Sequence, residues 1–597
     1  MVSPPLDAAD ASGSPSVPAA ETRLLAADVG SVYTRVYLIE DVEGERRLVA
    51  AGQAPTVADT GQPAVAAALA QALSRALDHT GRSPERGAAE TSPRILMTSL
   101  AAVPRIAVVA PREDDAREIA AAFEALPVRV LDPILREGAA GDPEVLLGQL
   151  EAQAPDAIVI AGGARAADQP LAEGAVEAVA RGFGARAPLV MLAGGRPFVN
   201  AAGPLLGALR SVDAAGDAAR VGVALRDAAR GLAGERLGEP DLRSRALAGW
   251  DAPLSSSLDG VCAATELIAE RYDVDALTLD LGAGHAMAVA AIGSAGRRRL
   301  AVAARDDLGL RLGRLRLLRE AGAAQINRWL PADLDDSALL AEVRRGSLVP
   351  AGLPETVDDL LIEHAFAREA LRLAVQDLSR ALGSGASPNP PLPPIDLLVG
   401  SGGVLAAVPR LMQAALILLD AAQPEALTQL ALDRAAALPL LGQIARREGA
   451  AGLGAALERD GLLNLGLCIA PVGAGQEGET AIKVEVAYTN RPPVTVEVPF
   501  GAVETVPLPI GERAALKLWP AKDFDVGLGR GNAATPRSEV EGGAVGIIVD
   551  ARGRPLALPD TAEKRQAKLL QWLQGTRAYP HLSFVAPAVA ATAEGAV

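Results

Sequence analysis

The residues best suited to chemistry stand in two Asp-x-Gly turns, each of which directly follows an apolar segment. The first turn contains Asp28 and Gly30, and the second contains Asp280 and Gly282. Glycine at such a turn lets backbone N–H groups approach a phosphate without a Cβ in the way. An aspartate at the end of a strand can hold a hydrated Mg²⁺ or orient a water molecule. These turns therefore predict phosphate binding.

Each turn opens the same unit of three strands. After Asp28, alternating and apolar segments predict strands over residues 34–39 and 47–52; after Asp280, they predict strands over residues 286–292 and 299–304. One Asp-x-Gly turn alone is most often a plain hairpin turn. Two copies that open the same unit indicate an internal repeat whose halves could hold a polyphosphate from both sides.

A glycine-rich turn follows the second copy. Residues 395–399 predict a buried strand, which enters Gly400-Ser401-Gly402-Gly403 and then a helical segment over residues 409–419. Glycines at such a turn permit flat contact with a base or ribose, and a helix N-terminus favours negative charge. An ordinary tight turn between strand and helix is the alternative, but the position after two phosphate-type turns favours a nucleotide.

The ordered set of these three turns resembles the phosphate-1, phosphate-2 and adenosine motifs of the actin/Hsp70/sugar-kinase ATPase superfamily. Within it, the sequence is most similar to the glutamate mutase-associated MutL (GlmL) family, which is unrelated to the DNA mismatch-repair protein of similar name. The similarity extends from about Leu24 to about Leu467 and includes residues 155–163, 307–309 and 427–433.

The resemblance implies a two-lobed actin-like ATPase fold, a duplicated ribonuclease H-like α/β fold, with an inserted α/β subdomain. It implies ATP or ADP with Mg²⁺ as cofactors, and Asp28 and Asp280 as catalytic residues and metal ligands. It also implies a protein partner, an adenosylcobalamin-dependent mutase that the chain services as an accessory or reactivating factor. The nucleotide contacts it implies are Gly30, Ser31, Thr34, Arg35, Gly282, Ala283 and Gly284 for the phosphates, and Gly400, Ser401, Gly402 and Gly403 for the adenosine.

The second phosphate turn departs from the family pattern. The family's Asp-x-Gly-Gly-Ala-Thr-Thr-Asp ends here in His285-Ala286-Met287, so both threonines and the second aspartate are replaced. His285 either supplies a lost hydrogen-bond donor or is an ordinary turn histidine. Whether the chain hydrolyses ATP stays open, and a nucleotide-binding scaffold that has lost hydrolysis is the alternative function. A small-molecule kinase ranks third, because no separate general base stands out.

The pattern along the chain predicts six segments, of which the first and last are loose tails. Alternating strand and helix signals predict the α/β subdomain, and period-two strands predict a C-terminal all-β domain that ends in a helix. The segments are a tail over 1–21, the first actin-like half over 22–93, the α/β subdomain over 94–250, the second half over 251–475, the β domain plus helix over 476–576, and a tail over 577–597.

Composition excludes several classes of function. The 597-residue chain carries 57 Lys+Arg against 73 Asp+Glu, a net charge of −16, so nucleic acid and anionic membranes are not expected partners. Two cysteines and four histidines make neither a disulfide framework nor a dedicated transition-metal site. No stretch has the pattern of a signal peptide or a membrane span, so we expect a cytoplasmic protein without membrane insertion.

Overall fold

The computed structural model describes most of the chain. The described residues are 23–56, 65–78, 94–99, 103–123, 126, 128–136, 142–163, 165–183, 188–237, 254–383, 392–449, 453–454, 456–536 and 539–579. Both predicted tails lie outside these ranges, apart from residues 577–579 at the start of the second. Among the helices of the described ranges, none is long and apolar enough to cross a lipid bilayer.

The first sheet has five strands in the order β11-β4-β1-β2-β3. The central β1 pairs antiparallel with β2 and parallel with β4, and β4 pairs parallel with β11. The amphipathic helix α1 (Val65–Asp78) packs its apolar side on this sheet. The strands are β1 (Arg23–Val29), β2 (Tyr33–Val42), β3 (Glu45–Pro55), β4 (Arg94–Ser99) and β11 (Leu254–Ser256).

The second sheet repeats this arrangement and then continues. Its order is β14-β13-β12-β15-β16-β17-β25-β21, and β12 pairs antiparallel with β13 and parallel with β15, as β1 does with β2 and β4. The strands are β12 (Ala276–Leu281), β13 (Ala286–Ile292), β14 (Arg299–Arg305), β15 (Leu397–Ser401), β16 (Ala426–Asp433), β17 (Leu462–Ala470), β25 (Gly546–Asp550) and β21 (Val503–Val506).

Five strands therefore occur twice with the same order and the same directions, which confirms the predicted duplicated ribonuclease H-like fold. A helix follows the fifth strand of each copy: α9 (Ser257–Tyr272) after β11, and α16 (Leu438–Glu448) after β16. These two helices touch at glycines: a Cβ added to Gly260 would lie 2.0 Å from the carbonyl oxygen of Pro439. Together they fill a core shared by both sheets.

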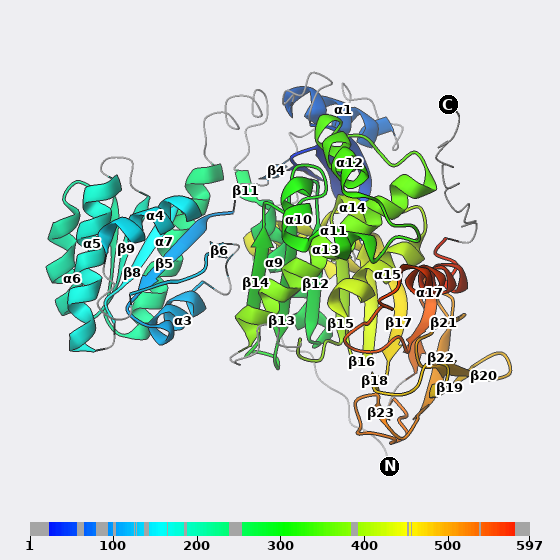
Figure 1. Cartoon of the computed structure of the whole chain (residues 1–597). Coiled ribbons are helices and arrows are strands. Elements are labelled where there is room, and N and C mark those ends of the chain that lie inside the picture. Colours follow the sequence, from blue (N-terminus) through cyan, green and yellow to red (C-terminus); the bar gives the residue numbers. More distant parts are fainter. Residues whose placement is uncertain are drawn as a thin grey trace, which may run out of the picture.

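Helices cover the remaining face of the second sheet. The long α13 (Val357–Leu382) and α15 (Leu411–Ala422) bury almost every apolar side chain, in one large core with β12 and β15. Three shorter helices, α10 (Arg314–Ala321), α11 (Ala323–Asn327) and α12 (Asp336–Leu348), pack beside α13 at the same end as α1 (Figure 1).

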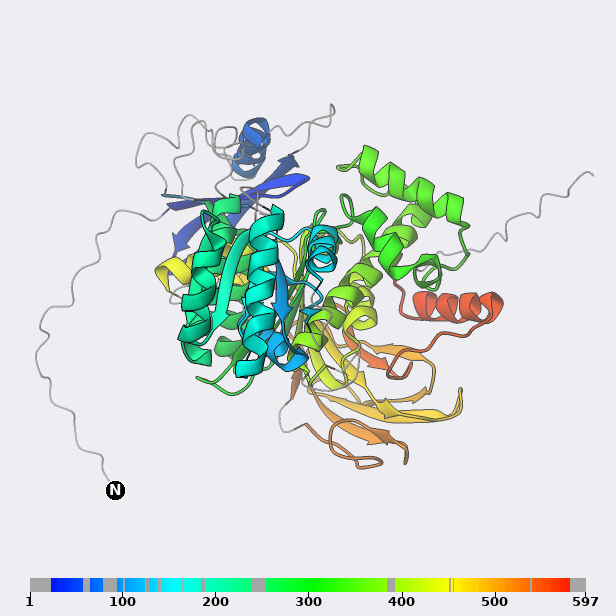
Figure 2. The same ribbon diagram turned by 60° about the vertical axis from the view of Figure 1, so that its left-hand side comes forward.

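The α/β subdomain stands to one side of this body and comes forward in Figure 2. Its parallel strands follow the order β10-β9-β8-β5-β6, with β7 also on β5, and helices cover both faces of the buried central strands. The elements are β5 (Arg105–Ala110), β6 (Arg129–Val130), β7 (Ile134–Leu135), β8 (Ala157–Ala161), β9 (Leu189–Gly194) and β10 (Ser211–Ala215), with α3 (Glu113–Ala121), α4 (Pro143–Gln153), α5 (Gln169–Phe183), α6 (Arg196–Ala202) and α7 (Ala218–Leu237).

The C-terminal strands divide between two sheets. β19 (Thr480–Tyr488) pairs antiparallel with β20 (Val494–Pro499) and β22 (Arg513–Pro520), as their period-two pattern predicts. β21 and β25, from the same predicted β domain, instead extend the second sheet, and α17 (Ala562–Gly575) packs into its core. The structure therefore differs from the predicted separate all-β domain. The reason is that local sequence patterns predict strands but not the strands with which they pair.

The start of the predicted second half also differs from the structure. β11 pairs with β4 of the first sheet, and α9 follows it, although both lie inside the range 251–475. The first copy is thus completed only after the chain has left it to build the α/β subdomain. The sequence of a short strand that follows a long inserted domain does not indicate which sheet the strand joins.

Candidate nucleotide site

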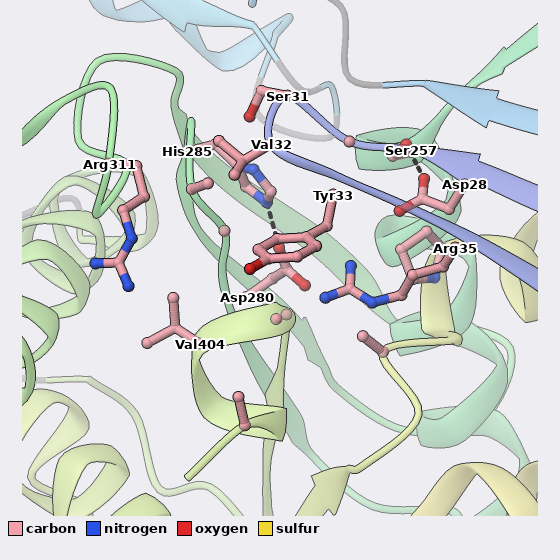
Figure 3. A pocket seen from close by; sticks show the side chains of 18 of the residues that line it. Asp28, Ser31, Val32, Tyr33, Arg35, Ser257, Asp280, His285, Arg311 and Val404 are labelled. Atoms are coloured by element: carbon pink, nitrogen blue, oxygen red, sulfur yellow. Dashed lines mark hydrogen bonds and ion pairs between the residues drawn. The ribbon is translucent and has the colours of Figure 1, made fainter. Parts of the chain in front are cut away.

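A pocket lies between the two copies, with the turns of both on its walls (Figure 3). The first copy contributes the turn after β1, the beginning of β2 and the first turn of α9. The second copy contributes the turn after β12 and the segment after β15. The lining includes Asp28, Gly30, Ser31, Tyr33, Arg35, Ser257, Asp280, Gly282, Ala283, His285, Arg311, Gly402 and Gly403.

The two phosphate-type turns have the same hydrogen bond. The Gly30 N–H donates to the carbonyl oxygen of Tyr33 (3.1 Å), and the Gly282 N–H donates to that of His285 (2.9 Å). A Cβ on Gly30 would lie 2.6 Å from the Tyr33 carbonyl oxygen, so this turn requires glycine. The matching bonds make Tyr33 and His285 equivalent positions of the repeat.

The third turn packs on the second. Gly402 has φ +91°, and a Cβ there would lie 2.3 Å from the carbonyl oxygen of Leu281. Gly402 and Gly403 line the pocket. Gly400 and Ser401 lie beneath it: Gly400 faces Leu418 in the core, and the Ser401 hydroxyl donates to Asp433. Only the second half of the predicted adenosine motif therefore faces the pocket.

Asp28 is held by two hydroxyl groups that sequence reasoning did not identify. The Oγ1 of Thr98, on β4, and the Oγ of Ser257, on α9, both donate to Oδ1 of Asp28, at 2.6 and 2.7 Å. No described residue donates to its other oxygen, Oδ2. Asp28 is buried but lines the pocket, so it presents one fixed carboxylate oxygen to whatever binds there.

Asp280 is engaged within its own turn. The Nε2–H of His285 donates to Oδ1 of Asp280, as the dashed line in Figure 3 shows. Burial acts to raise the pKa of Asp280, but the His285 imidazolium outweighs it and keeps the pKa below its usual value. Burial acts to lower the pKa of His285, and the Asp280 carboxylate raises it above its usual value. The negative charge of Asp280 is thus neutralised within the pair.

Arg35 reaches into the pocket from β2, between Asp28 and Asp280 (Figure 3). No residue of the described ranges forms a hydrogen bond or ion pair with its guanidinium group. Its Nη2 lies so close to Gly403 that a Cβ there would be 2.4 Å away. An unpaired guanidinium beside glycine turns offers a planar set of donors that matches phosphate oxygens.

The far wall of the pocket is tied to both copies. The Tyr33 hydroxyl donates to the carbonyl oxygen of Ala351 (2.5 Å), and Nη2 of Arg311 donates to that of Gly352 (3.1 Å). Arg311 also pairs with Glu363 of α13 at 2.5 Å. The segment between α12 and α13 therefore closes the pocket on the side opposite Arg35, which the sequence patterns did not predict.

Most of the predicted site residues come together in this pocket. They are Asp28, Gly30, Ser31, Arg35, Asp280, Gly282, Ala283, Gly402 and Gly403. Thr34 does not face it: its buried Oγ1 shares a hydrogen bond with Thr56 (2.9 Å). Thr34 alternates with Tyr33 and Arg35 on β2, so the period of two places it on the opposite face. Gly284 is buried behind its turn, against Gly309.

The pocket fits a phosphate chain better than it fits a two-carboxylate metal site. Arg35 is unpaired and both turns present glycines, as a phosphate chain requires. Asp28 offers one open oxygen for Mg²⁺, whereas Asp280 is bound to His285. Within the described part of the chain, no group of three or more His, Cys, Asp and Glu side chains forms a metal cluster. A magnesium ion here would depend on Asp28, water and phosphate oxygens.

The chain is similar to several solved structures, at low sequence identity and low TM-score. One is component A of (R)-2-hydroxyglutaryl-CoA dehydratase from Acidaminococcus fermentans (10% identity, 71% of this chain and 96% of that chain, TM-score 0.25). Another is the activator of 2-hydroxyisocaproyl-CoA dehydratase from Clostridium difficile, with bound ADPNP (10% identity, 70% of this chain and 92% of that chain, TM-score 0.27). A third is a glycerol dehydratase reactivase (12% identity, 64% of this chain and 92% of that chain, TM-score 0.27).

No curated protein matches the chain. The model of one protein family, described as MutL protein, matches residues 247–456. This segment holds α9, the second phosphate turn, the third glycine turn and α16, which together form one side of the pocket and its floor. The resemblance stated from the sequence is therefore confirmed over residues 247–456, the segment that the MutL protein family model matches.

Proposed function

We propose that the chain binds ATP or ADP in the pocket between its two copies and acts on a partner protein. The observation that carries this proposal is the unpaired Arg35 guanidinium, which lies between the glycine turns and the open oxygen of Asp28. Arg35 and the N–H groups of the turns at Gly30 and Gly282 would hold phosphates, with Gly402 and Gly403 beside the nucleoside. Asp28 would hold Mg²⁺, which screens phosphate charge when bound.

The partner would be an adenosylcobalamin-dependent mutase, by the resemblance to the glutamate mutase-associated family. We place this activity in the cytoplasm, in keeping with the two free, buried thiols of Cys262 and Cys468. A nucleotide that bridges both copies favours one relative orientation of them, and a partner bound to the chain would respond to that orientation.

A nucleotide-binding scaffold without hydrolysis is the second candidate, and the His285–Asp280 pair supports it. A carboxylate neutralised by an imidazolium is a weaker base for an attacking water than a free carboxylate. On this reading the nucleotide stabilises one conformation of the two copies and is not consumed.

Isothermal titration with Mg-ATP and Mg-ADP, followed by phosphate release from the same sample, tests both candidates. We expect saturable binding by the wild type and at least about tenfold weaker binding by Arg35→Ala, because one charged donor group is lost. Binding with slow release of phosphate favours the ATPase, and binding without release favours the scaffold. Equal affinity of wild type and Arg35→Ala contradicts the proposed site.

A further inference from the structure

A second large cavity, separate from the nucleotide pocket, lies between the α/β subdomain and the second copy. It is a groove of about 820 Å³. One wall is formed by α3, β6 and the end of α4, and the other by β14, α10 and the C-terminal end of α13. Figure 1 shows β6 on the side of the subdomain that faces β14.

Each wall contains the edge strand of a sheet. β14 is the first strand of the second sheet, and within the described residues it pairs only with β13. β6 is at one end of the subdomain sheet. Residues 302–305 of β14 line the groove, although they are buried, with 3–7% of their surface exposed. The unpaired edge therefore lies deep in the cavity. An open edge of this kind is a template for an added strand.

The groove is basic in an acidic protein. Its lining holds seven arginines and three acidic residues, whereas the whole chain has a net charge of −16. The arginines are Arg105, Arg117, Arg129, Arg299, Arg305, Arg316 and Arg380, and the acids are Asp132, Glu320 and Asp377.

The arginines of the groove differ in how many ion pairs they form with carboxylates. Arg305 is buried and pairs with Asp307, Glu320 and Asp377. The guanidinium of Arg105 donates to the carbonyl oxygen of Gln153 and forms no carboxylate pair with a described residue, while its buried Nε has no partner. Arg105 is therefore held by a backbone carbonyl and not by an ion pair of its guanidinium group with a described carboxylate.

Two arginines at the rim remain accessible. The side chain of Arg117, on α3, is 66% exposed, and that of Arg380, on α13, is 54% exposed. They stand on opposite walls, and each pairs with acids of its own helix in exposed ion pairs, which are weak. A carboxylate in the groove could compete for both. The floor between them contains apolar side chains, among them Phe123, Val128 and Val302.

The groove is connected to the nucleotide pocket through one short segment. Arg129 of β6 pairs with Asp307 at 2.6 Å, across the gap between the walls. Three residues further along the chain, the Leu310 N–H donates to the carbonyl oxygen of Gly282, in the second phosphate turn (3.1 Å). A change in the position of β6 against β14 can therefore reach that turn through Asp307.

We propose that this groove binds an extended, acidic segment of the partner protein, laid along the open edge of β14. The backbone of β14 would supply hydrogen bonds, the arginines would select carboxylates, and the apolar floor would take every second side chain. This proposal rests on the partner that the proposed function requires, and it adds where and by what chemistry that partner is held.

A fluorescence-anisotropy titration of the full chain with a labelled ten-residue peptide that alternates glutamate and valine tests this. We expect saturable binding that weakens with added salt. Arg117→Glu/Arg380→Glu should weaken it at least about tenfold, because like charges then face the peptide. The matched control is Arg181→Glu/Arg513→Glu, two arginines outside the groove whose side chains are 74% and 62% exposed.

Two further peptides separate strand addition from simple charge attraction. A peptide with alternate backbone nitrogens methylated along one edge keeps its charge but cannot pair with β14, and it should lose binding. A peptide in which lysine replaces glutamate should not bind. Equal binding of the methylated peptide, or of the groove variant and the wild type, would overturn the proposal, as would no saturable binding of the acidic peptide.

The nucleotide titration distinguishes the two proposals. Arg117→Glu/Arg380→Glu should bind Mg-ADP like the wild type, since neither residue lines the nucleotide pocket. Arg35→Ala should lose nucleotide affinity and keep peptide affinity. If the wild type binds the peptide but not the nucleotide, only the proposed nucleotide site is contradicted. If it binds the nucleotide but not the peptide, only the proposed groove is contradicted.

Discussion

The guanidinium group of Arg35, on the first copy, rests against the Cα of Gly403, on the second: a Cβ there would lie 2.4 Å from Nη2. This contact joins the two halves of the repeat at the floor of the pocket. It also explains why residue 403 is glycine, because any side chain would push the one unpaired cation of the described pocket out of its place.

Gly403→Ala should therefore weaken nucleotide binding while leaving the fold intact. The added methyl group meets the end of a flexible side chain, so the chain can adjust at little cost in stability, but Arg35 moves. We expect at least about a tenfold loss of Mg-ADP affinity by calorimetry, or about 1.4 kcal/mol. The control is Gly148→Ala, a helix position with nothing within 4 Å of the new Cβ. An unchanged affinity would show that the phosphates do not depend on Arg35.

Asp28 and Asp280 should differ in their effect on the magnesium dependence of binding. Asp28→Asn keeps an oxygen for the hydroxyls of Thr98 and Ser257 but removes the charge, so we expect ADP affinity in Mg²⁺ to fall to its value in EDTA. Asp280→Asn should retain most of the gain from Mg²⁺, because its carboxylate is already bound to His285. Titrations of both variants with and without Mg²⁺ measure this, and equal losses would contradict the asymmetry.

His285→Thr should raise phosphate release, since it frees Asp280 from the imidazolium. We expect an increase on the order of a hundredfold in a single-turnover assay, the lower end of what a positioned base contributes. Restoring the family's residues at 286 and 287 as well would be harmful, because Ala286 and Met287 are fully buried. His285→Gln is the control that also removes the charge but keeps a donor. No gain in His285→Thr would show that the pair does not limit hydrolysis.

The stability of the second copy should depend on the protonation of Asp433. Burial raises the pKa of this carboxyl from 3.8 to about 6, against the N–H groups of Leu438 and Ala437 that donate to it. A raised folded-state pKa contributes stability that is fully present below the unfolded pKa and is lost as pH rises through the folded one. The difference between a pKa of 3.8 and one of about 6 corresponds to about 3 kcal/mol.

Asp433→Asn keeps an acceptor oxygen for one of the two N–H groups, which bond to different oxygens of Asp433, and it does not titrate. The free energy of unfolding of the wild type relative to this variant should therefore fall by about 2 kcal/mol between pH 4.5 and pH 7.5, because part of the effect is already lost below pH 4.5. Chemical denaturation at the two pH values measures it. A constant difference would mean that Asp433 titrates near its ordinary pKa.

The contact between α9 and α16 should tolerate no added methyl group. A Cβ on Gly442 would lie 1.9 Å from the carbonyl oxygen of Gly260, a backbone atom that cannot move aside. We expect Gly442→Ala to lower the free energy of unfolding by about 1–3 kcal/mol, the usual cost of overpacking. Thermal unfolding checks this against Gly174→Ala on α5, where the new Cβ meets nothing.

The sequence predicts the local parts of the site better than its supports. Asp28, Asp280 and the glycines are identified because strand, turn and glycine are adjacent in the chain. The sequence motif predicts both Arg35 and Thr34 as phosphate contacts, but strand alternation puts them on opposite faces of β2, so only Arg35 faces the pocket. Applying the period of two to β2 would have excluded Thr34 and added Tyr33.

The supports of Asp28 come from distant parts of the chain. Thr98 and Ser257 are 70 and 229 residues away from it in sequence. Neither belongs to a sequence motif, because their hydroxyl groups can bond to Asp28 only when the fold brings β4 and α9 next to β1. The contact between His285 and Asp280 is local in the sequence. The departure from the family pattern singles out His285, but it does not indicate that His285 bonds to Asp280.

The place at which the α/β subdomain leaves the first sheet has a consequence for how this protein can be altered. The excursion begins after β4 and ends at β11, and these two strands are parallel neighbours. Parallel neighbours cannot be joined by a tight turn and need a crossover of a dozen or more residues. The subdomain is therefore itself the crossover. Excising it and closing the gap with a hairpin loop would reverse β11, whereas replacing it with a helical crossover would preserve the sheet and remove only one wall of the groove.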